Sequence, residues 1–227
     1  MMKRAVDLKM SRILRDCNTK SYELWIEDWT GGKNIFRNSI SKSGPYKHRR
    51  PTKCPLMKEA KEYMVSAWNA SVTLHLEAED MCIIGAYKHG VHRSIVACID
   101  KDLLCHPLEF YNYSDKNTLG GGLGIAIPPQ TRYVVSHTEA TLHFYRQLLT
   151  GDPTDSIPGI KGIGKKRAIG LIKDPVTAQD DAIRVYKKHK HGYSYFIEQF
   201  NLLYIRSTGS TDVFYPITKG FYDAVEE

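Results

Sequence analysis

The sequence predicts an α/β fold with a central, mainly parallel sheet flanked by helices. Short apolar runs that suit buried strands alternate with longer stretches of helical periodicity. Acidic residues follow several of these runs, and a glycine-rich hairpin comes later, between two helical stretches. The chain has 227 residues, which suffices for one sizeable core. We therefore expect a single domain over residues 1–227.

The apolar periodicity gives the elements in order. Helices are expected over 6–14, 58–71, 79–87, 138–149 and 178–190. Strands are expected over 22–27, 72–76 and 94–99. Residues 110–113 and 133–136 bracket a loop with glycine and proline, which predicts a hairpin or an inserted excursion. The chain thus divides into an α/β part over 1–140, a helix-hairpin-helix over 141–173 and a helical part over 174–227.

Composition excludes several classes of protein. No apolar run is long enough for a membrane span, and the first residues lack the apolar stretch of a signal peptide. The 5 cysteines form an odd set without a CxxC pair, which favours reduced thiols over a disulfide or zinc framework. We therefore expect a cytoplasmic protein with no membrane partner.

The net charge of +7 points to a polyanionic partner. Between Lys33 and Lys58 the chain has 8 lysines and arginines and no acidic residue. A solvated basic face usually carries interspersed acids, so this run predicts a segment that faces phosphate, a loop or arch at about residues 33–62.

Carboxylates collect where the predicted strands end. They are Asp28, then Glu77, Glu79 and Asp80, then Asp100 and Asp102, with Asp152 and Asp155 just before the glycine hairpin. Functional sites in α/β sheets lie beyond the carboxyl ends of strands, and gathered carboxylates need cations to offset their repulsion. Oxygen ligands suit Mg²⁺ or Mn²⁺. Any single member, above all Asp80, can instead be a helix cap or a surface acid.

The segment Pro158–Ala168 is the strongest local signal. Three glycines allow a tight turn that DNA backbone can approach closely, and two isoleucines anchor the turn in a core. Lysines and an arginine add attraction that does not read sequence. The alternative is a purely structural turn. The expected DNA contacts are Gly159, Lys161, Gly162, Gly164, Lys165, Lys166 and Arg167.

These motifs together resemble the 5′-nuclease superfamily, which includes flap endonucleases, bacteriophage 5′-exonucleases and the 5′-nuclease domain of bacterial DNA polymerase I. The resemblance runs in order from about residue 28 to residue 172, less clearly to residue 206, and it implies a PIN-like arrangement of the α/β fold. It rests on Gly151–Asp155 leading into the hairpin, on Leu76–Asp80, on Asp100–Asp102, and on Phe36–Arg37 followed by Tyr46–Arg50.

The resemblance implies a structure-specific 5′-3′ exonuclease or flap endonuclease of DNA replication or repair, of bacteriophage type. It implies two Mg²⁺ ions, for which Mn²⁺ can substitute, and a K⁺ held by hairpin carbonyls. Asp28, Glu77, Glu79 and Asp80 would serve the first ion, and Asp100, Asp102, Asp152 and Asp155 the second. Lys47 and Arg50 would be catalytic at the scissile phosphate, and Arg37, Tyr46 and Arg49 would contact DNA beside them. The implied partner is DNA with a 5′ flap, nick or free 5′ end, or an RNA–DNA hybrid, bound by a monomer.

The sequence departs from the family at its start. Family members begin with a strand that carries an aspartate, and nothing in residues 1–20 fits that pattern. Two readings therefore stand: an active nuclease, and a relative that binds branched DNA through the hairpin without turnover. A third class, a sequence-specific repressor, fits less well because a glycine hairpin suits backbone contacts rather than base contacts.

Overall fold

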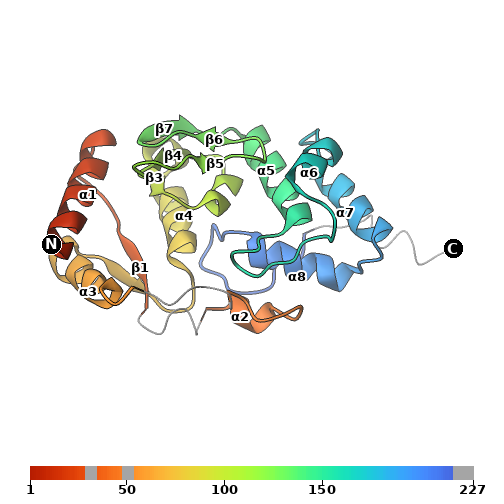
Figure 1. The fold of residues 1–227 in the computed structure, drawn as a ribbon, viewed down its shortest axis with the longest axis horizontal. Helices are drawn as coiled ribbons and strands as arrows, with labels where there is room; N and C mark the ends of the chain where they lie inside the picture. Colours follow the sequence, from red (N-terminus) through yellow and green to blue (C-terminus); the bar gives the residue numbers. More distant parts are fainter. Residues whose placement is uncertain (29–34, 48–53, 217–227) are drawn as a thin grey trace.

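The protein is described by a computed structural model that covers residues 1–28, 35–47 and 54–216 (Figure 1). Its helices are α1 (Met2–Asp16), α2 (Arg37–Ile40), α3 (Met57–Trp68), α4 (Ala78–His89), α5 (His137–Thr150), α6 (Lys165–Leu171), α7 (Ala178–Lys188) and α8 (Tyr193–Leu203). Its strands are β1 (Trp25–Glu27), β2 (Ser71–Thr73), β3 (Ile95–Cys98), β4 (Glu109–Asn112), β5 (Leu119–Gly120), β6 (Ala126–Ile127) and β7 (Thr131–Val134). Two short 3-10 helices span Val91–Arg93 and Lys101–Cys105.

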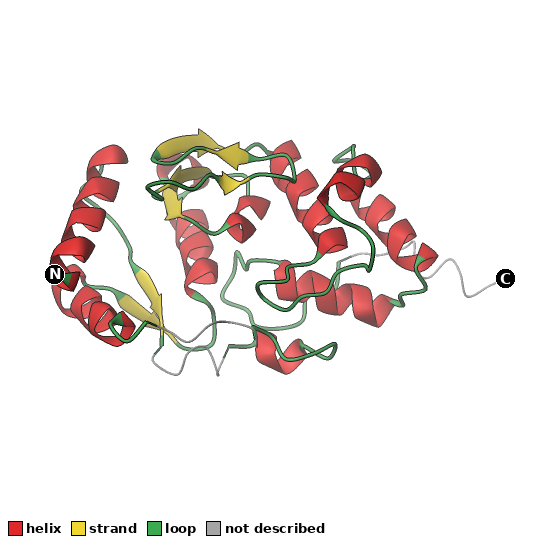
Figure 2. Ribbon diagram, in the orientation of Figure 1, coloured by secondary structure: helices red, strands yellow, loops and turns green. Residues whose placement is uncertain are grey.

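The strands of the described residues form three separate sheets rather than one central sheet (Figure 2). β1 pairs with β2 in parallel, and β3 pairs with β4 in parallel. β7 adds to β4 in the antiparallel direction, and β5 and β6 form a small hairpin. The prediction of parallel strands is confirmed, and the prediction of one continuous sheet is wrong for this part of the chain. The expected hairpin between residues 110–113 and 133–136 is confirmed as the β4–β7 pair.

Helix α1 begins earlier than expected and lies beside α3. Its Asp7 accepts hydrogen bonds from the Tyr63 hydroxyl at 2.8 Å and from the Trp68 indole nitrogen at 2.9 Å. At the other end of the helix, Asp16 accepts from the Tyr111 hydroxyl on β4. The helix therefore ties the β1–β2 end of the molecule to the β3–β4–β7 sheet.

Two apolar clusters hold the molecule together, and α5 contributes to both. Ala140 belongs to the cluster around β3, β4 and the β5–β6 hairpin, whereas Phe144 belongs to the cluster of α5 to α8. Helix α5 starts with a capping box, in which Ser136 and Glu139 satisfy each other's backbone N–H groups. No helix in the described residues is long and apolar enough to cross a membrane.

Candidate metal and DNA site

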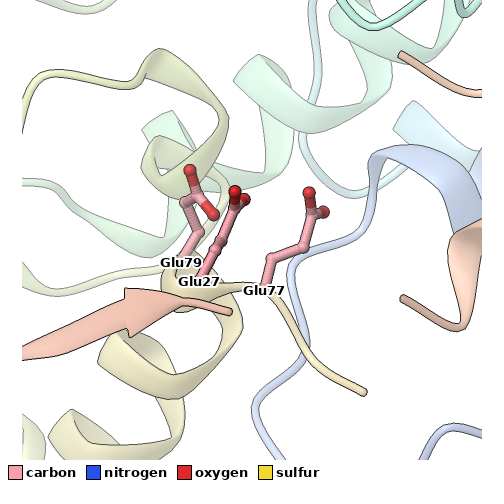
Figure 3. Close-up of side chains that lie close together, drawn as sticks. All are labelled: Glu27, Glu77 and Glu79. Carbon is pink, nitrogen blue, oxygen red and sulfur yellow. The ribbon is translucent and has the colours of Figure 1, made fainter. Parts of the chain in front are cut away.

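Three glutamates come together where β1 and β2 end (Figure 3). Glu27 is the last residue of β1, Glu77 is the N-cap residue of α4, and Glu79 lies in the first turn of α4. Parallel pairing brings the carboxyl ends of both strands to one edge, so the chain that leaves β2 enters α4 beside Glu27. Each side chain offers an oxygen, and these oxygens lie within 4.8 Å of one another. This spacing suits a divalent cation with oxygen ligands.

Sequence reasoning missed Glu27 and selected its neighbour Asp28. Successive strand residues point to opposite faces, so only one of the two can face α4 from β1. Asp28 is buried and directly follows the strand, but it is not a member of the glutamate group. Lys61 on α3 donates to the backbone carbonyls of Glu27 and Asp28, which fixes this strand end. The sequence does not show which of these two adjacent acids faces α4 where β1 ends, and that orientation was the missing information.

A lysine and a tyrosine from the segment before the undescribed residues 48–53 reach into the glutamate group. The Lys47 ammonium contacts Glu77 and lies 3.5 Å from Asp155. The Tyr46 hydroxyl lies 3.0 Å from Glu77 Oε2 and 3.2 Å from Asp155 Oδ2, and it can donate to one of them at a time. Asp155, predicted beside Asp152 at the second ion, therefore lies with the first group.

Glu79 has the most strongly perturbed carboxyl of this group. Burial first, and then the negative charges of Glu77 and Asp100, raise its pKa to about 8, although Lys47 opposes the shift. Its Oε2 atom is buried and has no hydrogen-bond partner in the described part of the chain. A buried acceptor without a donor costs free energy, so the atom is suited to a bound cation.

A second carboxylate group surrounds Lys101. The Lys101 ammonium lies 2.7 Å from Asp102 Oδ1 and contacts Asp152, while the Gln147 side chain donates to Asp102 at 2.6 Å. Asp100 accepts from the backbone N–H of Asp102 at 3.0 Å. Burial and the charge of Asp100 raise the pKa of Asp102 to about 7. The lysine stands between the two carboxylates as the cation of this group.

Arg37 lies inside the protein, so the structure contradicts its predicted contact with DNA. Its side chain has 0% exposure and forms ion pairs with Glu77 at 2.8 Å and Asp80 at 2.7 Å. It also donates to the carbonyls of Leu202, in the last turn of α8, and of Tyr204, which follows the helix. An acid-free basic run suggested an exposed contact, but the acids that pair with this arginine are distant in sequence.

Asp80 is likewise a structural residue rather than an available ligand. Its two oxygens accept two hydrogen bonds from Arg37 and one each from the backbone N–H groups of Glu77 and Arg206. Four donors occupy the acceptor sites of both oxygens. The predicted metal role is corrected to a capping box of α4, in which Glu77 and Asp80 satisfy each other's backbone.

The glycine segment forms a turn between α5 and α6. Gly159 and Gly162 have φ of +60° and +82°, in the left-handed region that favours glycine. A Cβ at Gly159 would lie 2.3 Å from the backbone nitrogen of Gly151, so the close approach requires glycine as well. Ile160 and Ile163 are buried in the cluster of α5 to α8. The turn is therefore anchored from inside.

The predicted phosphate contacts of this segment lie on its outer side except for Gly159, which is buried and whose predicted DNA contact is wrong because protein groups use its N–H and its carbonyl. Gly162, Gly164 and the basic residues Lys161, Lys165, Lys166 and Arg167 are exposed. Tyr195 on α8 donates to the Gly159 carbonyl at 2.8 Å, and the Gly159 N–H donates to Gln199. Arg49 and Arg50 lie outside the described residues, so their predicted roles stay predictions.

No protein-family model matches the chain, and a search of curated proteins finds no sequence match. Solved structures do match. The T5 D15 protein co-crystallised with metal ions has a TM-score of 0.60 at 14% identity, over 88% of this chain and 82% of that chain. The T5 5′-exonuclease with bound zinc gives 0.58 at 14% identity, over 88% and 80%.

A third solved structure is a pseudo-enzyme-product complex of the bacteriophage T5 D15 flap endonuclease with DNA and metal ions. It gives a TM-score of 0.58 at 14% identity, over 89% of this chain and 80% of that chain. The chain therefore shares the fold of the bacteriophage T5 5′-exonuclease, as the resemblance to 5′-nucleases predicts.

Proposed function

We propose that this chain is a metal-dependent 5′-nuclease that hydrolyses DNA phosphodiester bonds near free 5′ ends. The observation that carries the proposal is the gathering of two carboxylate groups, one at Glu27, Glu77 and Glu79 and one at Asp102 and Asp152. Each group holds a lysine ammonium, but each has more carboxylates than cations. Such an excess of buried negative charge favours divalent cations.

The residues fit hard cations such as Mg²⁺, with Mn²⁺ as a substitute, because every candidate ligand is a carboxylate oxygen. Glu27, Glu77 and Glu79 would hold one ion, with Asp155 beside it. Asp100, Asp102 and Asp152 would hold the other. Bound ions of this kind neutralise a scissile phosphate and make water a nucleophile at neutral pH.

The two lysines have separate tasks in this proposal. Lys47 lies against Glu77 with only 14% of its side chain exposed, so it is held at the edge of the glutamate group. There it can donate to a scissile phosphate and stabilise developing negative charge, together with Arg50. Lys101 keeps Asp102 and Asp152 together by offsetting their mutual repulsion.

The exposed basic residues of the hairpin would bind the DNA backbone. Contacts to phosphate position a duplex without reading its bases, so recognition depends on structure, such as a 5′ flap, a nick or a free 5′ end. RNA–DNA hybrid is a second candidate substrate, and K⁺ is the candidate ion for the hairpin carbonyls. We infer a monomer that acts in replication or repair. Among its structural neighbours, one T5 complex contains DNA and metal ions.

Replacing Asp102 with Ala separates a nuclease from a relative that only binds DNA. Cleavage of a 5′-flap duplex should fall at least about 100-fold, since a buried carboxylate of the second group is lost. Binding of the same duplex in EDTA should stay within about twofold, because Asp102 is not on the hairpin. Asp115→Ala is the matched control, since Asp115 is exposed and its ion pairs among the described residues are with Lys9 and Arg12 on α1.

Unchanged cleavage in the Asp102→Ala variant would contradict the site. A wild-type chain that binds but does not cleave would support the binding-only alternative. Competition with unlabelled duplexes of unrelated sequence addresses the repressor class, and all of them should compete equally.

A further inference from the structure

The loop between β5 and β6 exposes bare backbone outside the glycine hairpin of residues 158–168. From Leu119 to Ile127 every residue that points inward is a large apolar one, and every exposed residue is glycine or alanine. Gly122, Gly124 and Ala126 are the exposed positions. Backbone with no side chain in front of it can be approached closely by another backbone.

The loop also presents unused hydrogen-bond donors. Gly120, Gly121 and Gly122 have φ of +80°, +78° and +84°, and Gly124 has +120°. Gly121 donates to the Ile125 carbonyl, but the N–H groups of residues 122–124 have no acceptor in the described part of the chain. Successive N–H groups in such turns form concavities that bind anions.

Lys165 joins this loop to the basic helix α6. A Cβ at Gly122 would lie 2.7 Å from Lys165 Cδ and 3.0 Å from its Nζ, so the lysine side chain crosses the bare backbone of Gly122. Arg146 on α5 connects the loop to the C-terminal end of α6. It donates to the Leu123 carbonyl at 2.8 Å and to the Ile172 carbonyl at 3.0 Å. The loop tip and the end of α6 are therefore held together.

The charge on the β5–β6 loop and the start of α6 favours binding of a polyanion. The chain has no acidic residue from 116 to 138, which covers the whole loop. Lys165, Lys166 and Arg167 supply positive charge next to it. No like-charged group on the loop would repel a phosphate that sits on Lys165.

We propose that the N–H groups of residues 122–124 and the Lys165 ammonium bind one phosphate of a DNA duplex, next to the phosphates bound by the hairpin. The proposal rests on the proposed function and adds a second protein segment to its DNA surface. The loop would extend the footprint on the duplex without reading bases, since backbone donors contact phosphate oxygens.

Ala126→Glu tests the loop, because it places a negative charge on the exposed strand face beside Gly124 without changing a glycine. Binding of a fluorescent flap duplex in EDTA should weaken about fivefold to tenfold at about 0.1 M salt. The slope of log K against log salt should fall in magnitude by about one. Leu8→Glu is the matched control, since Leu8 is exposed on α1, at the opposite end of the molecule from α6 (Figure 1). It adds the same charge and should change binding by less than twofold.

A second measurement does not depend on a variant. Addition of the duplex to labelled wild-type protein in EDTA should shift the backbone amide NMR signals of Gly122 and Gly124. Equal binding of both glutamate variants, with silent glycine signals and a shifted Lys166 signal, would overturn the loop contact and leave the hairpin proposal intact. A wild-type chain with no affinity for the duplex would instead overturn both proposals.

Discussion

The two carboxylate groups, here called together the carboxylate edge, differ from the glycine hairpin in where their charged side chains lie. The carboxylate edge buries charged side chains, and the glycine hairpin exposes them. At the edge, Arg37 and Asp80 are wholly buried, and Glu77, Asp102 and Asp152 are nearly so. In the hairpin, Ile160 and Ile163 fill the interior while the lysines face solvent. A buried charge is costly unless it is paired, whereas an exposed charge costs almost nothing. The edge therefore depends on its cations for stability, and the hairpin depends on apolar packing.

Arg37→Met should give the largest effect on stability, because it removes the cation that Asp80 and Glu77 share in the interior. Breaking a buried ion pair from one side costs about 3–5 kcal/mol. Urea unfolding measures the loss. Lys58→Met removes an exposed i,i+4 pair with Glu62 and should cost less than about 0.5 kcal/mol. Equal losses in the two variants would contradict the contrast between buried and exposed charge.

Divalent cations should stabilise the edge without acting on the hairpin. Mn²⁺ at about 100 times its dissociation constant should raise the free energy of unfolding by about 2.7 kcal/mol. Glu79→Gln should lose most of this gain, since it replaces a carboxylate of the glutamate group. Lys166→Gln should retain all of it. Thermal unfolding with and without Mn²⁺ gives the comparison, and equal gains in the two variants would place the ion elsewhere.

His143, on α5 next to Lys101 of the second carboxylate group, should lower the free energy of unfolding as the pH falls. Burial lowers its pKa to about 4; Nε2 lies 3.0 Å from the Lys101 carbonyl, and Nδ1 has no partner among the described residues. As the pH falls from 6.5 towards 4, the unfolded chain binds a proton that the folded chain does not. The histidine should therefore remove about 2 kcal/mol of stability at pH 5.

The check is the difference between wild type and His143→Gln, because groups common to both proteins then cancel. Between pH 7 and pH 5 the variant should lose about 2 kcal/mol less than wild type in urea unfolding. An equal loss in both proteins would show that His143 does not carry the effect.

Lys166→Gln should leave stability unchanged within about 0.5 kcal/mol, since Lys166 is exposed at the start of α6. Its effect should appear in binding, where the slope of log K against log salt falls in magnitude by about one. Titration of a labelled duplex at several salt concentrations measures the slope. A loss of stability without a change in slope would assign the lysine to the fold instead.

The sequence predicted the features that depend on short spacings. Glycine spacing and buried isoleucines indicated the turn at 158–164, and acids after apolar runs indicated where carboxylates gather. Periodicity predicted helices α1, α3, α4, α5 and α7 and strands β1 to β3 in order, but it did not predict α8 or the β5–β6 pair. The sequence did not predict that the strands form separate sheets, because the residues of a short strand do not specify which strand it pairs with.

The misplaced residues share one cause, which is that spacing does not tell where a side chain points. Arg37 was predicted to contact DNA, but it pairs in the interior with acids that are distant in sequence. Asp80 was predicted to bind a metal ion, but its oxygens belong to the capping box of α4. Glu27 and Asp28 are adjacent, and the orientation of a three-residue strand decides which one faces α4. Packing over long sequence separations sets all three outcomes.

The most direct test of the central claim is cleavage of a 5′-labelled flap duplex by the purified wild-type chain, in Mg²⁺ and in EDTA. The carboxylate edge predicts a short labelled product, cut near the junction, that forms in Mg²⁺ and is absent in EDTA. An intact flap in Mg²⁺, with the duplex still bound, would contradict a working metal site and leave a protein that only grips DNA.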